Sequence, residues 1–78
     1  MTLKIISTTE VVFEGSVDAV QLPGEKGRFT VLNHHASLVS SLAKGKIVYR
    51  LPDGAEQSFD VNGGIADIDN NVVSVCIY

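Results

Sequence analysis

The sequence has no tryptophan, a single cysteine and two prolines, and only 19% of its 78 residues are charged. One cysteine excludes an internal disulfide, which favours a reducing compartment, and we interpret Cys76 as a small buried hydrophobe near the end of the last strand. No apolar run reaches the roughly 18 residues that a membrane helix needs, and the first residues lack the apolar run of a signal peptide. We therefore expect membrane association only through a partner, and the scarcity of charge leaves apolar surface to bind one.

Basic residues are also few. Six Lys and Arg against nine Asp and Glu give a formal net charge of -3, which argues against nucleic acid as a ligand because a phosphate backbone needs a basic surface. The charges are unevenly placed: residues 51–78 hold five acids and no base, whereas five bases and no acid lie between Glu25 and Asp53. The sequence therefore predicts one acidic and one basic region.

Short segments rich in β-branched residues are what the chain does contain. Its length suits a single domain, residues 1–78, with a thin core. We expect strands over residues 3–7, 11–13, 16–22, 36–43, 46–51, 55–61, 65–69 and 72–78. Residues 36–43 also suit one helical turn, and we favour a strand there on context. The regular recurrence of short strands without a long helix is typical of an all-β antiparallel sandwich.

Turn-forming residues lie between these predicted strands. The Asp-Gly pair in residues 52–54 predicts a hairpin with a two-residue primed turn, and residues 69–71 predict a second tight turn, because Asn tolerates left-handed φ. Ile65 and Ile68 are three residues apart, a spacing that in a strand implies a bulge or twist. Residues 72–78 are expected to form a mostly buried strand.

Residues 22–39 organise the chain. The first half combines Pro23 with Gly24 and Gly27, which permit tight reversal around a charged pair. The second half is apolar and carries the only two histidines. We predict an exposed working loop held between two strands.

No constellation in the sequence indicates catalysis or metal binding. His34 and His35 are adjacent, so on a strand they point to opposite faces, with one packed or capping and one exposed. The nearby serines lack the Gly-x-Ser-x-Gly turn that presents a catalytic nucleophile. Asp67 and Asp69 fit a solvated strand edge. Residues 24–28 lack the Gly-Lys-Ser/Thr ending and the following helix that a nucleotide-binding loop requires. We expect no catalytic, cofactor-binding or metal-binding residues in this small, non-enzymatic β domain.

A set of short motifs points to a family. They are Phe13-Glu14-Gly15, Pro23-Gly24-x-x-Gly27-x-Phe29-x-Val31-Leu32, His35-Ala36-x-Leu38-Val39, Lys44-Gly45, Gly63-Gly64 and a closing Val-x-Val strand. Each is weak alone, but their order and spacing together make a specific match over essentially the whole chain. The chain resembles the N-terminal β-sandwich domain of the epsilon subunit of F-type ATP synthases.

The resemblance implies a flattened antiparallel β-sandwich or barrel of about ten short strands. It also implies a place in the rotor stalk, bound to the gamma subunit and to the ring of c subunits, where ion flow is coupled to ATP synthesis. The expected location is the cytoplasmic face of a bacterial inner membrane, reached through the complex. By the same resemblance, Glu25, Lys26, Gly27 and Arg28 face the c-ring, and Ser7, His35 and Ser40 lie near gamma.

The sequence departs from the family at three positions. The family usually has Gly where Thr30 stands and Pro where Asn33 and Ser37 stand, so we expect the chain after Phe29 to be less rigid or to take another path. Family members commonly continue into a helical hairpin linked to inhibition of ATP hydrolysis. We expect a short epsilon subunit, or an isolated N-terminal domain, without that inhibitory arm.

Two other classes of function remain open from the sequence. A free-standing β-sandwich adaptor or small-ligand binding module would share the fold without the rotor, and would be favoured by a concave apolar pocket with converging polar groups. An enzyme is the third class, and turnover that depends on His35 would indicate it.

Overall fold

Nine short strands form the regular structure of this protein in a computed structural model that describes residues 1–78. The strands are β1 (Thr2–Ile6), β2 (Val11–Ser16), β3 (Ala19–Gly24), β4 (Gly27–Leu32), β5 (Leu38–Leu42), β6 (Gly45–Arg50), β7 (Glu56–Val61), β8 (Gly64–Asp69) and β9 (Val72–Ile77). No helix is present, so the all-β prediction is confirmed, with nine strands where about ten were expected. The ambiguous segment 36–43 contains a strand, β5.

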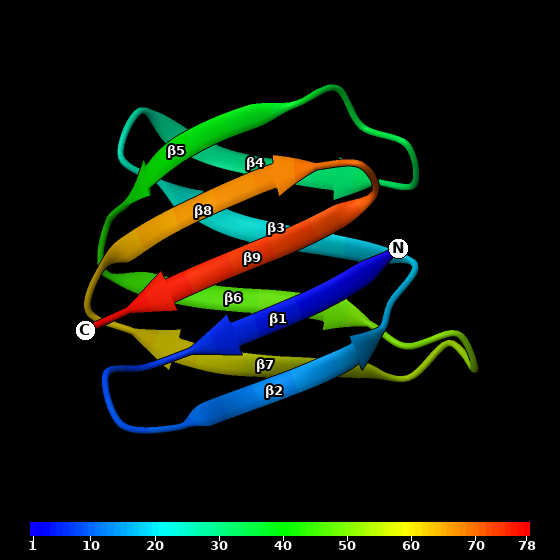
Figure 1. Ribbon diagram of the computed structural model, residues 1–78, viewed down its shortest axis with the longest axis horizontal. Coiled ribbons are helices and arrows are strands. Elements are labelled where there is room, and N and C mark those ends of the chain that lie inside the picture. Colours follow the sequence, from blue (N-terminus) through cyan, green and yellow to red (C-terminus); the bar gives the residue numbers. More distant parts are fainter.

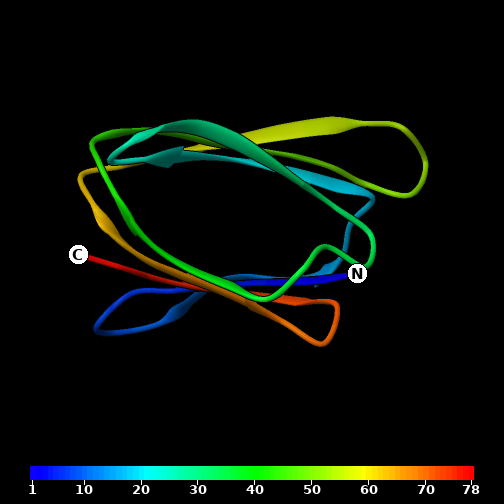
Figure 2. The same ribbon diagram turned by 90° about the horizontal axis from the view of Figure 1, so that it is seen from above.

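The strands form two layers (Figures 1 and 2). Hydrogen bonding runs in the order β2-β1-β9-β8-β5-β3-β6-β7, with β4 paired to β3. The first layer contains β2, β1, β9, β8 and β5, and the second contains β4, β3, β6 and β7. The layers join where Gly24 of β3 pairs with Leu42 of β5. The sandwich is confirmed, but β1 and β9 are parallel, so the sheet is not wholly antiparallel.

Alternating side chains from both layers fill the space between them. The buried cluster contains 14 apolar residues, and no polar or charged residue is buried with it. Burial alternates along strands such as β8, where Gly64, Ala66 and Ile68 are buried and Ile65, Asp67 and Asp69 are exposed. On the side away from β5, the rings of Phe13 and Tyr49 lie 4.5 Å apart and connect the layers.

The bulge lies elsewhere than predicted. Strand β8 keeps a regular register with both neighbours, and it exposes Ile65 while burying Ala66 and Ile68. Ile65 simply belongs to the other face of the strand, so the three-residue spacing requires no bulge. The irregular register occurs between Ile5 and Ile6 of β1, opposite β2.

Strand β9 is half-buried rather than mostly buried. Val73 and Val75 point into the core, while Val72 and Cys76 are exposed. The prediction that Cys76 is a buried hydrophobe is therefore wrong. The first layer is covered on one side only, so every second residue of an apolar strand still faces outward.

The two predicted turns differ in outcome. Asn70 and Asn71 have φ values of 50° and 63° and make the expected tight connection between β8 and β9. The hairpin between β6 and β7 is also present, but only Gly54 has positive φ. The Gly54 N–H donates to the Leu51 carbonyl at 2.9 Å, and the Leu51 N–H donates to the Ala55 carbonyl at 2.8 Å. These bonds define a three-residue loop with a glycine bulge, so the two-residue primed turn is wrong.

Candidate functional site

The turn between β3 and β4 contains only two residues, Glu25 and Lys26, because Gly24 pairs directly with Gly27. Most of residues 22–39 is thus a hairpin and the start of β5, and the prediction of one long loop is wrong. The β-branched and aromatic residues that follow Gly27 find partners along the whole of β3. What remains exposed as a loop is this tip and residues 33–37.

Gly24 and Gly27 are needed for different reasons. Gly27 has φ of 130°, and a Cβ there would meet no atom within 4 Å, so its requirement is conformational. Gly24 does not have positive φ. A Cβ on Gly24 would lie 2.7 Å from the Gly27 carbonyl oxygen and 2.9 Å from the Phe29 ring. Its requirement is therefore space, because the ring of Phe29 lies against the backbone of the tip.

The tip is anchored to the strand connections beside it. The Glu25 N–H donates to the Ser41 carbonyl at 3.0 Å, and the Ala43 N–H donates to the Pro23 carbonyl at 2.8 Å. These bonds attach the β3 side of the turn to β5 and to Ala43, which follows β5. The two charged side chains of the tip consequently project from a braced backbone.

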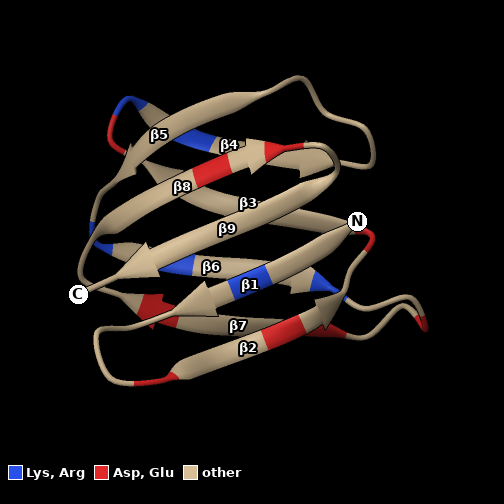
Figure 3. Ribbon diagram, in the orientation of Figure 1, with Lys and Arg blue, Asp and Glu red and all other residues tan.

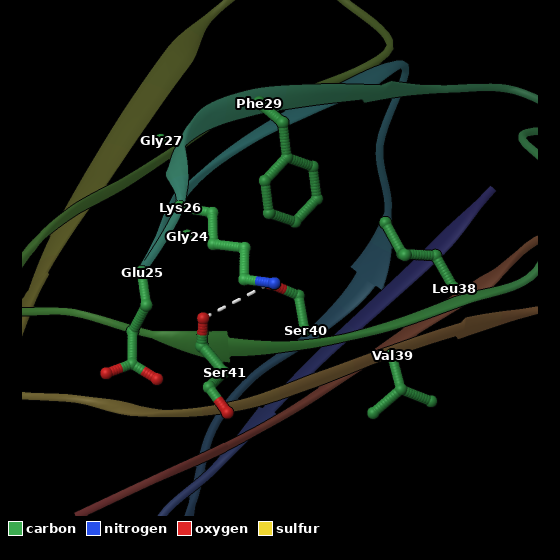
Figure 4. A pocket seen from close by; sticks show the side chains of 9 residues that line it. All are labelled: Gly24, Glu25, Lys26, Gly27, Phe29, Leu38, Val39, Ser40 and Ser41. Atoms are coloured by element: carbon green, nitrogen blue, oxygen red, sulfur yellow. Dashed lines mark hydrogen bonds between the residues drawn. The ribbon is translucent and has the colours of Figure 1, made fainter.

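A groove separates this tip from β5, and Figure 4 shows it. Its volume is about 420 Å³, and Phe29 and Leu38 supply its apolar surface. Lys26 extends across it toward the serines of β5 (Figure 4). The Ser40 hydroxyl donates to the Ser41 carbonyl at 3.1 Å, so its single proton is already used within β5.

The four residues predicted to face the c-ring lie close in sequence but not all at one surface. Glu25 and Lys26 occupy the tip, and Gly27 closes it. Arg28 lies on β4, where its Nε donates to the Gln21 side-chain carbonyl of β3 at 3.3 Å. The tip therefore presents one acid and one base, with the Arg28 guanidinium set back along the hairpin.

The three residues predicted near gamma are separated. Ser7 lies in the β1–β2 connection, where its Oγ accepts from the Thr9 and Glu10 N–H groups at 3.4 and 3.3 Å. His35 lies in the β4–β5 connection, and these two connections are at opposite ends of the strands (Figure 1). Ser40 lies on β5 beside the groove. The structure brings Ser40 near the tip and does not cluster the three residues.

The histidine loop, residues 33–37, is not a strand, so the prediction of opposite strand faces is wrong, and both histidines are exposed. Hydrogen bonds hold this loop: Asn33 Oδ1 accepts from the Met1 amine at 2.7 Å, and the Ser37 hydroxyl donates to Asp69 at 2.7 Å. The backbone N–H of His34 donates to the Asn71 side chain at 2.8 Å. Asn33 and Ser37 thus fix the loop through their side chains.

No group of three or more His, Cys, Asp or Glu side chains is placed to hold a metal ion. Nor does the structure contain a helix with the length and hydrophobicity for crossing a membrane. The predicted segment 22–39 includes Leu38 but not Ser41, which also lines the groove. The contribution of Ser41 is its backbone carbonyl, and no side-chain pattern signals that.

Comparison with known proteins identifies the family. Residues 1–77 match the model of the ATP synthase delta/epsilon chain beta-sandwich domain. The chain belongs to this family. The resemblance predicted from the motifs is thereby confirmed over almost every residue of the epsilon-type domain.

Two relatives illustrate how the match is distributed. The ATP synthase epsilon chain of a Nitratiruptor species is 38% identical over 77 residues, which cover 99% of this chain and 60% of that protein. The epsilon chain of Chlorobaculum tepidum is 36% identical over 70 residues, covering 90% of this chain and 80% of that one. This epsilon-type chain thus spans about 60% of the first relative. These names support the prediction of a non-catalytic subunit.

A solved structure has the same fold. One chain of the Euglena gracilis mitochondrial ATP synthase, in an assembly named OSCP/F1/c-ring, superposes with a TM-score of 0.91. It is 23% identical, and the match covers 96% of the epsilon-type chain and 48% of the Euglena chain. At this identity the likeness establishes the fold of the domain.

Proposed function

We propose that this chain acts as one domain, residues 1–78, in the rotor of an ATP synthase, where it binds the gamma subunit and the c-ring without catalysing a reaction. Family membership supports the complex. The observation that carries the finer proposal is the braced hairpin tip, in which Glu25 and Lys26 project from a backbone hydrogen-bonded to β5.

The tip has the properties that a torque-bearing contact needs. A rotor subunit must not slip against the ring, and polar pairs fix the register between two surfaces that apolar contact alone would let slide. An acid and a base on adjacent residues can pair with opposite charges on a polar loop. Because the Glu25 N–H is bonded to Ser41, a force on the tip is passed directly to β5.

The proposed gamma contacts are Ser7, His35 and Ser40, and their positions set the extent of the surface that gamma would cover. Ser7 and His35 lie in connections at opposite ends of the sandwich (Figure 1). A strand of six residues is about 20 Å long. A gamma surface that contacts all three residues must therefore extend along the strands, and a smaller contact would use Ser7 and Ser40 alone.

The location follows from the complex. The relatives named above are bacterial epsilon chains, which supports a peripheral position on the cytoplasmic face of a bacterial inner membrane. In this position the domain couples the flow of protons or sodium ions to ATP synthesis, and it meets the membrane only through its partners.

Size-exclusion chromatography with the gamma subunit and with the detergent-solubilised c-ring from the same source tests the proposal, with ATPase activity of the reconstituted catalytic hexamer followed alongside. We expect co-elution with both partners and no fall in activity. A Glu25→Ala/Lys26→Ala variant should lose the c-ring and keep gamma, whereas Asp53→Ala, in the exposed hairpin at the other end, should keep both.

Failure of the wild-type chain to co-elute at micromolar concentration would overturn the rotor function. It would favour a β-sandwich adaptor or small-ligand module, for which the groove beside Phe29 is the candidate pocket. Turnover of any substrate that disappears in His35→Ala would instead indicate an enzyme.

A further inference from the structure

The sandwich is open along the edge between β4 and β5. Strand β4 is hydrogen-bonded only to β3, and β5 meets the second layer only beside the hairpin tip, where Leu42 pairs with Gly24. The opposite edge of the sandwich is closed, because the rings of Phe13 and Tyr49 lie 4.5 Å apart between the layers. Beside β4 and β5, no strand and no pair of aromatic rings covers the space between the layers.

Strand register directs apolar side chains into this opening. Phe29 lies opposite Leu22, which is fully buried, and Leu38 lies opposite Ile68, which is also buried. Residues that pair directly across antiparallel strands share a face of the sheet, so Phe29 and Leu38 both point into the space between the layers. Leu38 is nevertheless 39% exposed, and Phe29 is half-buried. The groove is thus an uncovered part of the core and not a hollow in the outer surface.

A small residue at an inward position makes room for the groove. Ser40 pairs with the buried Ala66, and it lies between Leu38 and the buried Leu42 on the same face of β5. Its hydroxyl donates to the Ser41 carbonyl, so this polar group is satisfied within the strand. A leucine side chain at this position would extend into the groove. Serine instead leaves about 420 Å³, which is within the roughly 300–1,000 Å³ of ligand pockets.

One cation borders this apolar space. The Lys26 side chain extends across the groove toward β5 (Figure 4). The only salt bridge in the chain joins Lys46 to Asp60, so the Lys26 ammonium has no ion-pair partner within the protein. The Glu25 side chain lies at the end of the groove away from Leu38 (Figure 4). A ligand seated on the apolar side of the groove would therefore meet a single positive charge.

We propose that the groove binds a small carboxylate with an unbranched apolar chain, such as a short fatty acid. The chain would lie between the Phe29 ring and Leu38, and the carboxylate would pair with the Lys26 ammonium. A carboxylate carries one negative charge and matches the single cation, whereas a phosphate monoester carries about 1.5 to 2. The site goes beyond the proposed rotor function and does not depend on it. A bound carboxylate would neutralise one of the two charges that the tip offers to the c-ring, and that consequence alone rests on the proposed function.

Titration of the isotope-labelled chain with octanoate, followed by its backbone amide signals in two-dimensional NMR, tests the site. We expect saturable changes at the amides of residues 26–29 and 38–41, with a dissociation constant of about 1 mM or lower. Octanol has the same chain without the charge and should bind at least about threefold more weakly. Acetate has the charge without the chain and should show no saturation at the same concentrations.

Two charge-reversed variants separate the Lys26 contact from the effect of net charge. Lys26→Glu should weaken octanoate binding on the order of tenfold, because it replaces attraction with repulsion. Lys44→Glu is the matched control, because it changes the net charge equally. Lys44 is exposed in the β5–β6 connection at the same end of the sandwich, where Figure 3 shows a base, but it does not line the groove. Lys44→Glu should leave the affinity for octanoate unchanged.

A variant that fills the groove tests the site without removing a contact of the fold. Ser40→Leu should abolish octanoate binding, because the leucine side chain would occupy the space. It should also raise Tm or leave it unchanged, because it adds apolar contact in an open part of the core. Loss of binding in a variant that is at least as stable as the wild type cannot be attributed to unfolding.

Several outcomes would overturn the site. Wild-type affinity for octanoate in Ser40→Leu or in Lys26→Glu would do so, as would amide changes confined to surfaces outside the groove. Tighter binding of octyl phosphate than of octanoate would overturn the carboxylate as the ligand class. Octanoate binding that persists in a chain unable to co-elute with the gamma subunit or the c-ring would support this site and overturn the rotor function.

Discussion

Replacing Gly24 with Ala should distort the hairpin tip and measurably destabilise the domain. The added methyl group would lie 2.7 Å from the Gly27 carbonyl oxygen and 2.9 Å from the Phe29 ring. The carbonyl belongs to the turn itself and cannot move without opening it. Overpacking of this kind costs typically 1–3 kcal/mol, and we expect about 2 kcal/mol here, equivalent to a fall in Tm of roughly 8–16 °C for a domain of this size.

Thermal unfolding followed by circular dichroism measures the global loss, and amide hydrogen exchange measures the local one. The Glu25 amide, bonded to the Ser41 carbonyl, should exchange faster in Gly24→Ala than in the wild type, because a shifted turn lengthens that bond. Gly54→Ala is the control. Gly54 has φ of 93°, and a Cβ there would meet no atom within 4 Å, so the substitution strains only the backbone of a distant hairpin. It should lower Tm without changing exchange at Glu25.

The double variant Gly24→Ala/Phe29→Ala separates the two contacts. If the ring contributes to the clash, its removal relieves part of the strain, and the double variant should lose less free energy of unfolding than the sum of the single variants, by about 0.5 kcal/mol or more. A Gly24→Ala protein with Tm within about 2 °C of wild type and unchanged exchange at Glu25 would refute this account of the tip.

Two further predictions concern the core. Ile68→Ala should lower the free energy of unfolding by about 2–5 kcal/mol because it leaves a cavity at a buried site. Ile65→Ala should lower it by under about 0.5 kcal/mol, because Ile65 is exposed. Urea unfolding measures both variants, and equal losses would contradict the assignment of faces in β8. Burial raises the pKa of the Tyr49 phenol, so above about pH 10 the unfolded chain loses this proton first and the free energy of unfolding falls as pH rises. Tyr49→Phe should flatten that decline relative to wild type and to a Tyr78→Phe control, and an unchanged slope would exclude Tyr49 as its source.

Local chemistry made part of the fold predictable. The strand predicted at residues 46–51 corresponds to β6, and its period of two places Ile47 and Tyr49 inside and Lys46 outside. The Asn70-Asn71 turn followed from the tolerance of Asn for left-handed φ. These features depend on residues within a few positions of one another, and the sequence contains that information directly.

Features that depend on distant partners were predicted poorly. Strand β4 was missed because the glycines and charged residues of positions 24–28, where it begins, resemble a loop, and only pairing with β3 makes residues 27–32 extended. The exposure of Cys76 depends on which side of the first layer is covered, which β9 alone does not reveal. The position of the tip was correctly predicted. Its backbone hydrogen bond to Ser41, however, joins residues 16 positions apart, and neither side chain takes part in it, so the sequence does not indicate it.

The parallel pairing of β1 with β9 has a consequence for how the protein is made. Strand β1 pairs on one edge with β2, which follows it closely in the sequence, but its other edge stays open until residues 72–77 have been synthesised. Contacts of such long sequence separation slow folding, and an open strand edge is a site for pairing with another chain. The domain therefore cannot complete its first layer until residues 72–77 have been synthesised, and until then the open edge of β1 can pair with another chain.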